Sequence, residues 1–257
     1  MHAKLHKSLG GLSKIAAASA LVAMATPTLA DFQNARVTNN QQSEVVRQRF
    51  FDYLLYPTAG QAQLSFFAQP IGQGFTTAVG AVVGSTKGLW DTNLVMPNTL
   101  PSGANYLIDS IEVLMTPGSS AAANTYLPQV VQQFIAAAVT TIGNSSNDVN
   151  LFYQSGLLEL NILSKNYLRE TPLLAFPPKA HFDGVMALAT NSATTSEVAQ
   201  TFLKAAGRPY YVEPRISLQS AVNFDVTLRW PAPVATPSGF NARVGVILDG
   251  YAMRASQ

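Results

Sequence analysis

The chain contains no cysteine among its 257 residues. That absence excludes a disulfide scaffold, a thiolate metal site and a cysteine nucleophile. Charge is also scarce, because Asp, Glu, Lys and Arg together make up 12% of the chain, against about 25% in typical soluble proteins. With a formal net charge of only +2, the composition argues against a disordered charged tail and against a basic nucleic-acid groove.

The hydrophobic fraction is an ordinary 47%, and a chain of this length builds a core without a covalent staple. A large protein with few charges is expected where much of its surface is hidden in a permanent assembly, because charged residues are depleted at the buried centre of interfaces. The composition therefore favours a body that associates with copies of itself.

Residues 1–30 form a segment distinct from the body at 31–257. The segment is basic at its start and then uncharged and Ala-rich, so removing it takes the net charge from +2 to −1. Two interpretations stand: a secretory signal peptide cleaved after Ala30, or a retained helical arm that contacts lipid or a neighbouring subunit. The apolar run is too short to span a membrane. The contact residues of such an arm are Lys4, Lys7, Lys14, Ile15, Leu21 and Val22.

Most of the body carries the alternation and turn residues of short β-strands. The clearest is 222–230, where the apolar residues alternate with polar ones and are predicted to face inward: Val222, Phe224, Val226, Leu228 and Trp230. Further strands are expected at 61–68, 106–115, 156–163, 167–176, 182–189, 210–218 and 242–253. The Gly-rich stretch 72–84 is expected to form a strand with bulges or loop crossings, and 43–55 fits either a helix or a strand.

Two helices are expected. The first is 128–139, with Pro128 in its first turn and a loop at 143–147 after it. The second starts at Thr194, where Glu197 completes a capping-box spacing, and ends at Gly207.

About ten strands with two or three short helices, in no regular alternation, argue against a doubly wound fold. Strand spacing and turn chemistry favour an antiparallel jelly-roll sandwich, either a single roll with insertions or a compact double roll. Two full rolls would need about sixteen strands, since one roll has eight.

Few residues are arranged for chemistry. His181 and Asp183 would share one face of a strand, but a structural histidine is favoured because no third ligand or nucleophile accompanies them. Gly84-Ser85-Thr86-Lys87 has the wrong order for a phosphate loop, and Gly72-Gln73-Gly74 lacks the third glycine of a dinucleotide fingerprint. We therefore expect no catalytic residue, cofactor or metal.

Three weaker features are also interpreted as structural. The fourteen acidic residues are expected mostly in turns and on solvent faces, although pairs at glycosidase spacing form through the fold and not through sequence. The aromatic runs 50–53 and 210–211 favour core or interface packing over stacking on a ligand. Asn144-Ser145-Ser146 fits a glycosylation acceptor, a pattern that is common by chance.

Three pieces of the sequence resemble the jelly-roll major capsid proteins of tailless icosahedral bacteriophages, including the internal-membrane type. They are 91–94 (Asp-Thr-Asn-Leu) with Leu100-Pro101 and the strand 106–113; 169–177 (Arg-Glu-Thr-Pro-Leu-Leu-Ala-Phe-Pro); and 223–231 with 248–251 and Arg254. The resemblance is one of strand and loop style and covers roughly residues 45–257.

The resemblance implies a virion protein that carries no catalytic residues. Its strands would stand upright in the shell, its side faces would meet copies of itself, and its N-terminal arm would contact a membrane or another capsid protein. The double-roll members of the family form trimers, whereas a single roll would build its capsomers differently.

Two other classes compete with this hypothesis. One is a secreted or periplasmic β-sandwich, either a carbohydrate-binding module or a surface-layer or pilus-like subunit, in which residues 1–30 are cleaved. The other is an extracellular hydrolase, which would bring acidic residues together in one cleft.

Overall fold

A computed structural model describes residues 43–77, 80–117, 139–191, 194–204, 207–239 and 241–255. The arm residues Lys4, Lys7, Lys14, Ile15, Leu21 and Val22 lie outside these ranges, as does most of the helix expected at 128–139. Within them the protein is mainly β, as the sequence predicts.

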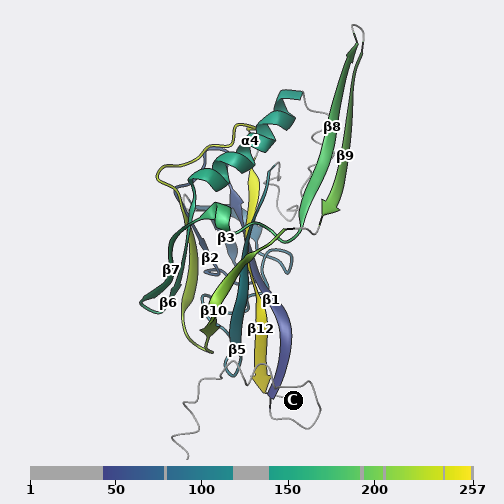
Figure 1. Cartoon of the computed structure of the whole chain (residues 1–257). Helices are drawn as coiled ribbons and strands as arrows, with labels where there is room; N and C mark the ends of the chain where they lie inside the picture. Colours follow the sequence, from purple (N-terminus) through teal and green to yellow (C-terminus); the bar gives the residue numbers. More distant parts are fainter. Residues whose placement is uncertain are drawn as a thin grey trace, which may run out of the picture.

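Eight strands form two four-stranded antiparallel sheets (Figure 1). Sheet 1 has the order β1 (Ser43–Tyr56), β12 (Ala242–Ala255), β5 (Asn105–Thr116), β10 (Tyr210–Leu218). Sheet 2 has the order β2 (Gln63–Phe66), β11 (Phe224–Arg229), β6 (Leu157–Ile162), β7 (Lys165–Pro172). One cluster of buried apolar side chains draws on both sheets, so the two sheets enclose a common core, as in a β-sandwich.

The pairing of these eight strands is nested. In chain order, the first pairs with the last (β1 with β12), the second with the seventh (β2 with β11), the third with the sixth (β5 with β10) and the fourth with the fifth (β6 with β7). Two hairpins are inserted into this pattern. One is β3 (Gly74–Thr77) with β4 (Gly80–Thr86), and the other is β8 (His181–Asn191) with β9 (Thr194–Lys204), which extends away from the sheets in Figure 1.

Strand β11 confirms the inward face predicted from alternation. It lies between β2 and β6, and its inward side chains Phe224, Val226 and Leu228 are buried, as is Trp230 just after it. Thr227 on the opposite face is buried as well, so the outward side of this central strand is not freely solvated.

Helix α4 (Val139–Ser155) packs against one end of the core. The ring of Phe152 lies 5.7 Å from that of Tyr56 and 5.0 Å from that of Trp230, and the Trp230 indole N–H donates to the Phe152 carbonyl (3.0 Å). The chain after the helix must pass very close to this cluster: a Cβ on Gly156 would lie 2.3 Å from Leu173 Cδ1, in the short 3-10 helix Leu173–Ala175. Glycine is therefore the residue that fits there.

The helix predicted from Thr194 is wrong, because this segment is strand β9. It pairs with β8 without interruption from His181↔Lys204 to Asn191↔Thr194. The prediction rested on Val198, Phe202 and Ala206, and residues four apart share a face in a strand as well as in a helix. The spacing therefore did not distinguish the two structures.

The loop predicted at 143–147 is also wrong, because these residues lie inside α4. Gly, Asn and Ser are poor helix formers, but the helix is secured further along by contacts of Asp148, Phe152 and Tyr153. The Asp148 carboxylate accepts from the Ser238 N–H (3.0 Å), and the Tyr153 hydroxyl donates to the Val113 carbonyl (2.6 Å). Tertiary packing overrides local propensity here.

Candidate assembly surface

A loop of residues 88–96, here called the apolar loop, exposes large hydrophobic side chains close together in sequence. Trp90 is 82% exposed, Leu89 72%, Val95 68% and Met96 45%. Single exposed apolar residues are ordinary, but a group of them marks an interaction site.

The apolar loop is fixed to β1, the edge strand of sheet 1. The Tyr53 N–H donates to the Asp91 carbonyl (2.7 Å), and the Phe51 N–H donates to Asn93 Oδ1 (3.0 Å). The Asn93 amide in turn donates to the Arg49 carbonyl (2.6 Å). These bonds cover part of a strand edge that would otherwise present unpaired backbone groups, and they hold the loop in one conformation.

Arg243 of β12 fastens the loop beside Trp90. Its guanidinium stacks 3.8 Å from the Tyr53 ring centre and donates to the Trp90 carbonyl and to Asp91 Oδ1. The Tyr53 ring has room because its cross-strand neighbour is Gly245, where a Cβ would lie 2.2 Å from the ring. These contacts therefore hold in place the backbone that carries the exposed Trp90 indole.

An ion pair inside the core anchors the start of the loop. Lys87 follows β4, and its Nζ contacts Asp52 Oδ1 of β1; both side chains are 0% exposed. The other carboxylate oxygen, Oδ2, accepts from the Phe67 N–H (2.7 Å). Burial raises the pKa of Asp52 and lowers that of Lys87, and the mutual attraction opposes both shifts.

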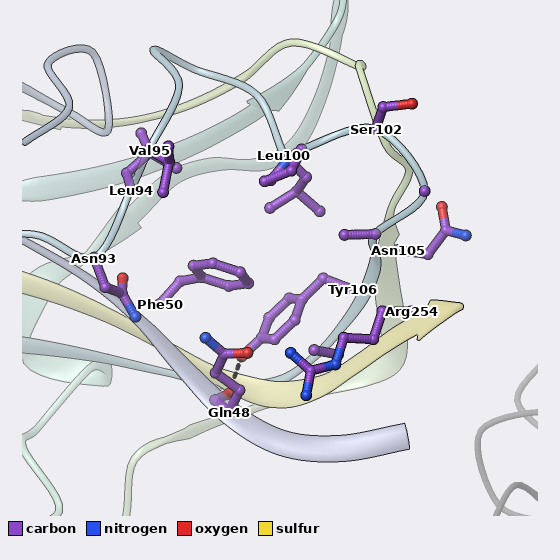
Figure 2. A pocket seen from close by; sticks show the side chains of 14 residues that line it. Gln48, Phe50, Asn93, Leu94, Val95, Leu100, Ser102, Asn105, Tyr106 and Arg254 are labelled. Atoms are coloured by element: carbon purple, nitrogen blue, oxygen red, sulfur yellow. Dashed lines mark hydrogen bonds between the residues drawn. The ribbon is translucent and has the colours of Figure 1, made fainter. Parts of the chain in front are cut away.

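A pocket of about 400 Å³ adjoins the loop (Figure 2). Phe50 and Tyr106 meet edge to face inside it, with ring centres 4.6 Å apart. The Tyr106 hydroxyl lies 2.6 Å from the Gln48 carbonyl, and burial raises the pKa of this phenol, so it stays neutral. Val95 belongs both to the pocket wall and to the apolar loop, and Arg254 brings a positive charge. The pocket and the loop thus form one continuous surface.

A charged cluster crosses all four strands of sheet 1. The Asp249 carboxylate accepts two bonds from Arg47 (3.2 and 3.0 Å), and Arg215 pairs with Asp109 at 2.6 Å. The guanidinium groups of Arg47 and Arg215 both lie over the Tyr251 ring. Hydrogen bonding to Asp249 raises the pKa of Arg47. The cluster neutralises most of its own charge, so we assign it to fixing strand register.

The residues considered for chemistry lie on several elements of the fold. His181 and Asp183 lie two apart on β8, beyond the two four-stranded sheets. Gly84–Lys87 does not precede a helix; it ends β4, and its lysine is buried. Gly72–Gly74 enters β3, and Asn144–Ser146 lies within α4. Gly72–Gly74 and Gly84–Lys87 lie side by side, since the Gly72 N–H donates to the Lys87 carbonyl (2.8 Å) and Gly74 pairs with Thr86, but neither segment leads into a helix that could hold a phosphate.

The expectation for the acidic residues is wrong. Among the acidic residues whose side chains the structure describes, seven are buried, namely Asp52, Asp91, Asp109, Glu112, Asp148, Glu159 and Asp249. None of the described residues that line the pocket is acidic. Across the described ranges, no group of three or more His, Asp or Glu is placed to hold a metal ion.

One feature of the sequence points to the buried lysine at the start of the apolar loop. Between Tyr53 and Ile108 only Lys87 and Asp91 are charged, and a lone lysine in such a stretch is expected to have a partner. The sequence does not predict that Trp90 is exposed, because a tryptophan in a loop is equally compatible with burial.

Among the helices of the described residues, none has the length and apolar character to cross a bilayer. Comparison with protein-family models, with curated proteins and with solved structures gives no match to the chain.

Proposed function

We propose that the chain is the major capsid protein of a tailless icosahedral bacteriophage, built on a single jelly roll and assembled from copies of itself. The observation that carries this proposal is the nested pairing of eight strands in two sheets. A hairpin of four strand pairs, wrapped round a core, produces this order, and the jelly roll of viral capsids has eight strands in two sheets. The twelve strands described fall short of two rolls.

The apolar loop and its pocket are the proposed contact between copies. Tryptophan is enriched among the residues that dominate binding energy at interfaces. Because backbone bonds and Arg243 already hold the loop, little conformational entropy is lost when it docks. The pocket of one copy offers an apolar recess to the apolar loop of a neighbouring copy. Two different parts of the surface then meet, as they do in contacts that close rings and shells.

Electron microscopy of the purified full chain, supported by sedimentation velocity, tests the proposal. We expect closed, symmetric particles or discrete capsomers of several copies. A protein that remains a monodisperse monomer at high concentration, and that is monomeric in its native source, would contradict it.

Trp90→Ala tests the contact itself. Truncating an interface hot spot costs about 2 kcal/mol or more, so the concentration for half-assembly should rise at least about tenfold. The measurement is sedimentation across a concentration series. Leu174→Ala is the matched control, since that side chain is 62% exposed outside the loop. Equal effects of the two substitutions, or none from Trp90→Ala, would remove the loop from the interface.

The competing function is a secreted or periplasmic β-sandwich protein, favoured by the signal-like pattern of residues 1–30. The intact mass of the protein from its native source separates the two. A mature chain that begins at Asp31 and stays monomeric supports secretion, whereas a chain that keeps residues 1–30 supports the capsid proposal.

A further inference from the structure

The buried pair of Asp52 and Lys87 joins two segments that are distant in sequence. Asp52 lies in β1, and Lys87 directly follows β4, at the start of the apolar loop. Both side chains are fully buried, and neighbouring residues of the pair, Phe50, Leu54 and Phe67, belong to the hydrophobic core. Bulk water is excluded from the two functional groups.

The reactive atoms of the pair are close. The Lys87 Nζ contacts Asp52 Oδ1, which is bonded to the carboxyl carbon Cγ. With a C–O bond of about 1.2 Å, Nζ lies within about 4 Å of Cγ, near the separation of about 3–3.5 Å at which bound groups react.

The other carboxyl oxygen of Asp52 is held separately. Oδ2 accepts a 2.7 Å bond from the Phe67 N–H, and the backbone of Asp52 is bridged to Thr92. A fixed N–H aimed at a carbonyl oxygen stabilises the negative charge that develops there during attack on the carbon. The carboxyl group is therefore oriented with one oxygen toward a donor and the other toward the amine.

Burial shifts both groups toward the uncharged forms that an acyl transfer needs. Burial is the largest influence on both groups: it raises the pKa of the Asp52 carboxyl and lowers the pKa of the Lys87 amine. Attraction between the partners opposes both shifts, and the nearby Asp91 also raises the pKa of Lys87. Transfer of one proton from Lys87 to Asp52 produces a neutral amine beside a carboxylic acid.

We propose that Lys87 and Asp52 form an intramolecular amide cross-link. The Nζ lone pair attacks Cγ, the Nζ–Cγ bond forms, and the Cγ–Oδ1 bond breaks. Oδ1 leaves as water with the acid proton and one proton from Nζ. Oδ2 remains as the amide oxygen, still bonded to the Phe67 N–H. No oxidant, reductant or cofactor enters the balance.

The cross-link would give a chain without cysteine a covalent closure at the base of its apolar loop. It would join β1 to the start of that loop, across 35 positions of sequence. This inference is independent of the proposed function, because it requires only the folded monomer.

Mass spectrometry of the purified, denatured full chain tests the cross-link. The intact mass should lie below the sequence mass by one water molecule. Chymotrypsin should release a branched peptide that joins the Asp52-Tyr53 segment to the segment containing Lys87-Gly88-Leu89. Trypsin should fail to cut the denatured chain after Lys87.

Two variants and one control make the result decisive. Lys87→Gln and Asp52→Ala should each show their full sequence mass, whereas the exposed Lys165→Gln should keep the deficit. Folding of each variant is checked by near-UV circular dichroism, and the wild-type peptides decide the question even if a variant does not fold. Linear peptides from both segments of the folded wild-type protein, or a deficit that persists in Lys87→Gln, would overturn the proposal.

Discussion

Each acidic side chain that is buried among the described residues receives a hydrogen bond or an ion pair. Asp249 is 1% exposed and receives two bonds from Arg47 and a further contact from Arg49 at 3.5 Å. Glu159 on β6 pairs with Arg229 of β11. Buried charges persist only when they are paired, so these seven acids contribute to internal order. The exposed surface is left with still fewer charges than the composition implies.

An unpaired charge in the same core should have the opposite effect. Val226 is fully buried in the central strand β11, so Val226→Asp places a carboxylate there without a donor. The cost of several kcal/mol is comparable with the whole stability of a domain, about 5–15 kcal/mol. We expect the variant to be insoluble or to lack a cooperative melting transition.

Asn223→Asp is the control for this substitution, because it adds the same charge at an exposed position next to the strand. Its free energy of unfolding should lie within about 1 kcal/mol of that of the wild type. Normal expression and melting of Val226→Asp would show that the face assignment of β11 is incorrect.

Residue roles were only partly predictable from the sequence. The inward set of β11 followed from alternation, because a central strand fixes which face is buried. The pairing of Asp52 with Lys87 and the contact of Arg243 with Trp90 join positions 35 and 153 residues apart. No local pattern encodes such contacts; they exist only once the sheets have formed.

At the scale of elements, sequence patterns locate most of the strands. They do not separate helix from strand where apolar residues recur every four positions, because that spacing fits both. Strands β5, β6, β10 and β12 match the predicted ranges closely, since turn residues bound them. The ambiguity of 43–55 is resolved as strand β1, whose fourteen residues pair continuously with β12. The segment of strand β9 also fits a helix, because its apolar residues are four apart. The order of strands within the sheets had no local signal at all.

The hairpin of β8 and β9 should be removable. Its strands pair only with each other among the described strands, and its two ends already meet, since the Gly207 N–H donates to the Lys179 carbonyl (3.1 Å). Replacing residues 181–206 with two glycines should leave the sandwich folded.

Thermal unfolding followed by circular dichroism measures this. We expect a cooperative transition within a few degrees of the wild type, because about 1 kcal/mol shifts the midpoint by roughly 2–4 °C in a chain of this size. Loss of the transition would mean that the hairpin is part of the core. If the sandwich folds and assembly is lost, the hairpin belongs to an interface.

For the whole molecule, the low charge and the fold are both compatible with a surface covered by copies of the same chain. A chain with 12% charged residues, in which at least seven acids are buried, presents a weakly charged surface. The sandwich adds to this surface a rigid loop with an exposed tryptophan and an adjacent apolar pocket. Such a surface suits a protein that is covered by its own copies, because few charges have to be desolvated at each contact.

The three lysines at the start of the chain, Lys4, Lys7 and Lys14, lead to a separate prediction about membrane binding. Deleting residues 1–30 should leave the body folded, with an unchanged near-UV spectrum, because the two described sheets begin at Ser43. It should abolish binding to vesicles that contain anionic phosphatidylglycerol. Each lysine near such a surface contributes about 1 kcal/mol, so replacing Lys4, Lys7 and Lys14 with Gln in the full chain should weaken binding roughly a hundredfold.

Vesicle flotation compares the full chain, the deletion and the triple Gln variant, with neutral phosphatidylcholine vesicles as the control. Salt provides a second control, because screening weakens attraction between exposed charges. If all three proteins float equally, segment 1–30 does not contact lipid and the arm interpretation fails. If the deletion binds no vesicles but the triple variant binds as the full chain does, the contact is made by the Ala-rich run around Leu21 and Val22, and the basic residues serve another purpose.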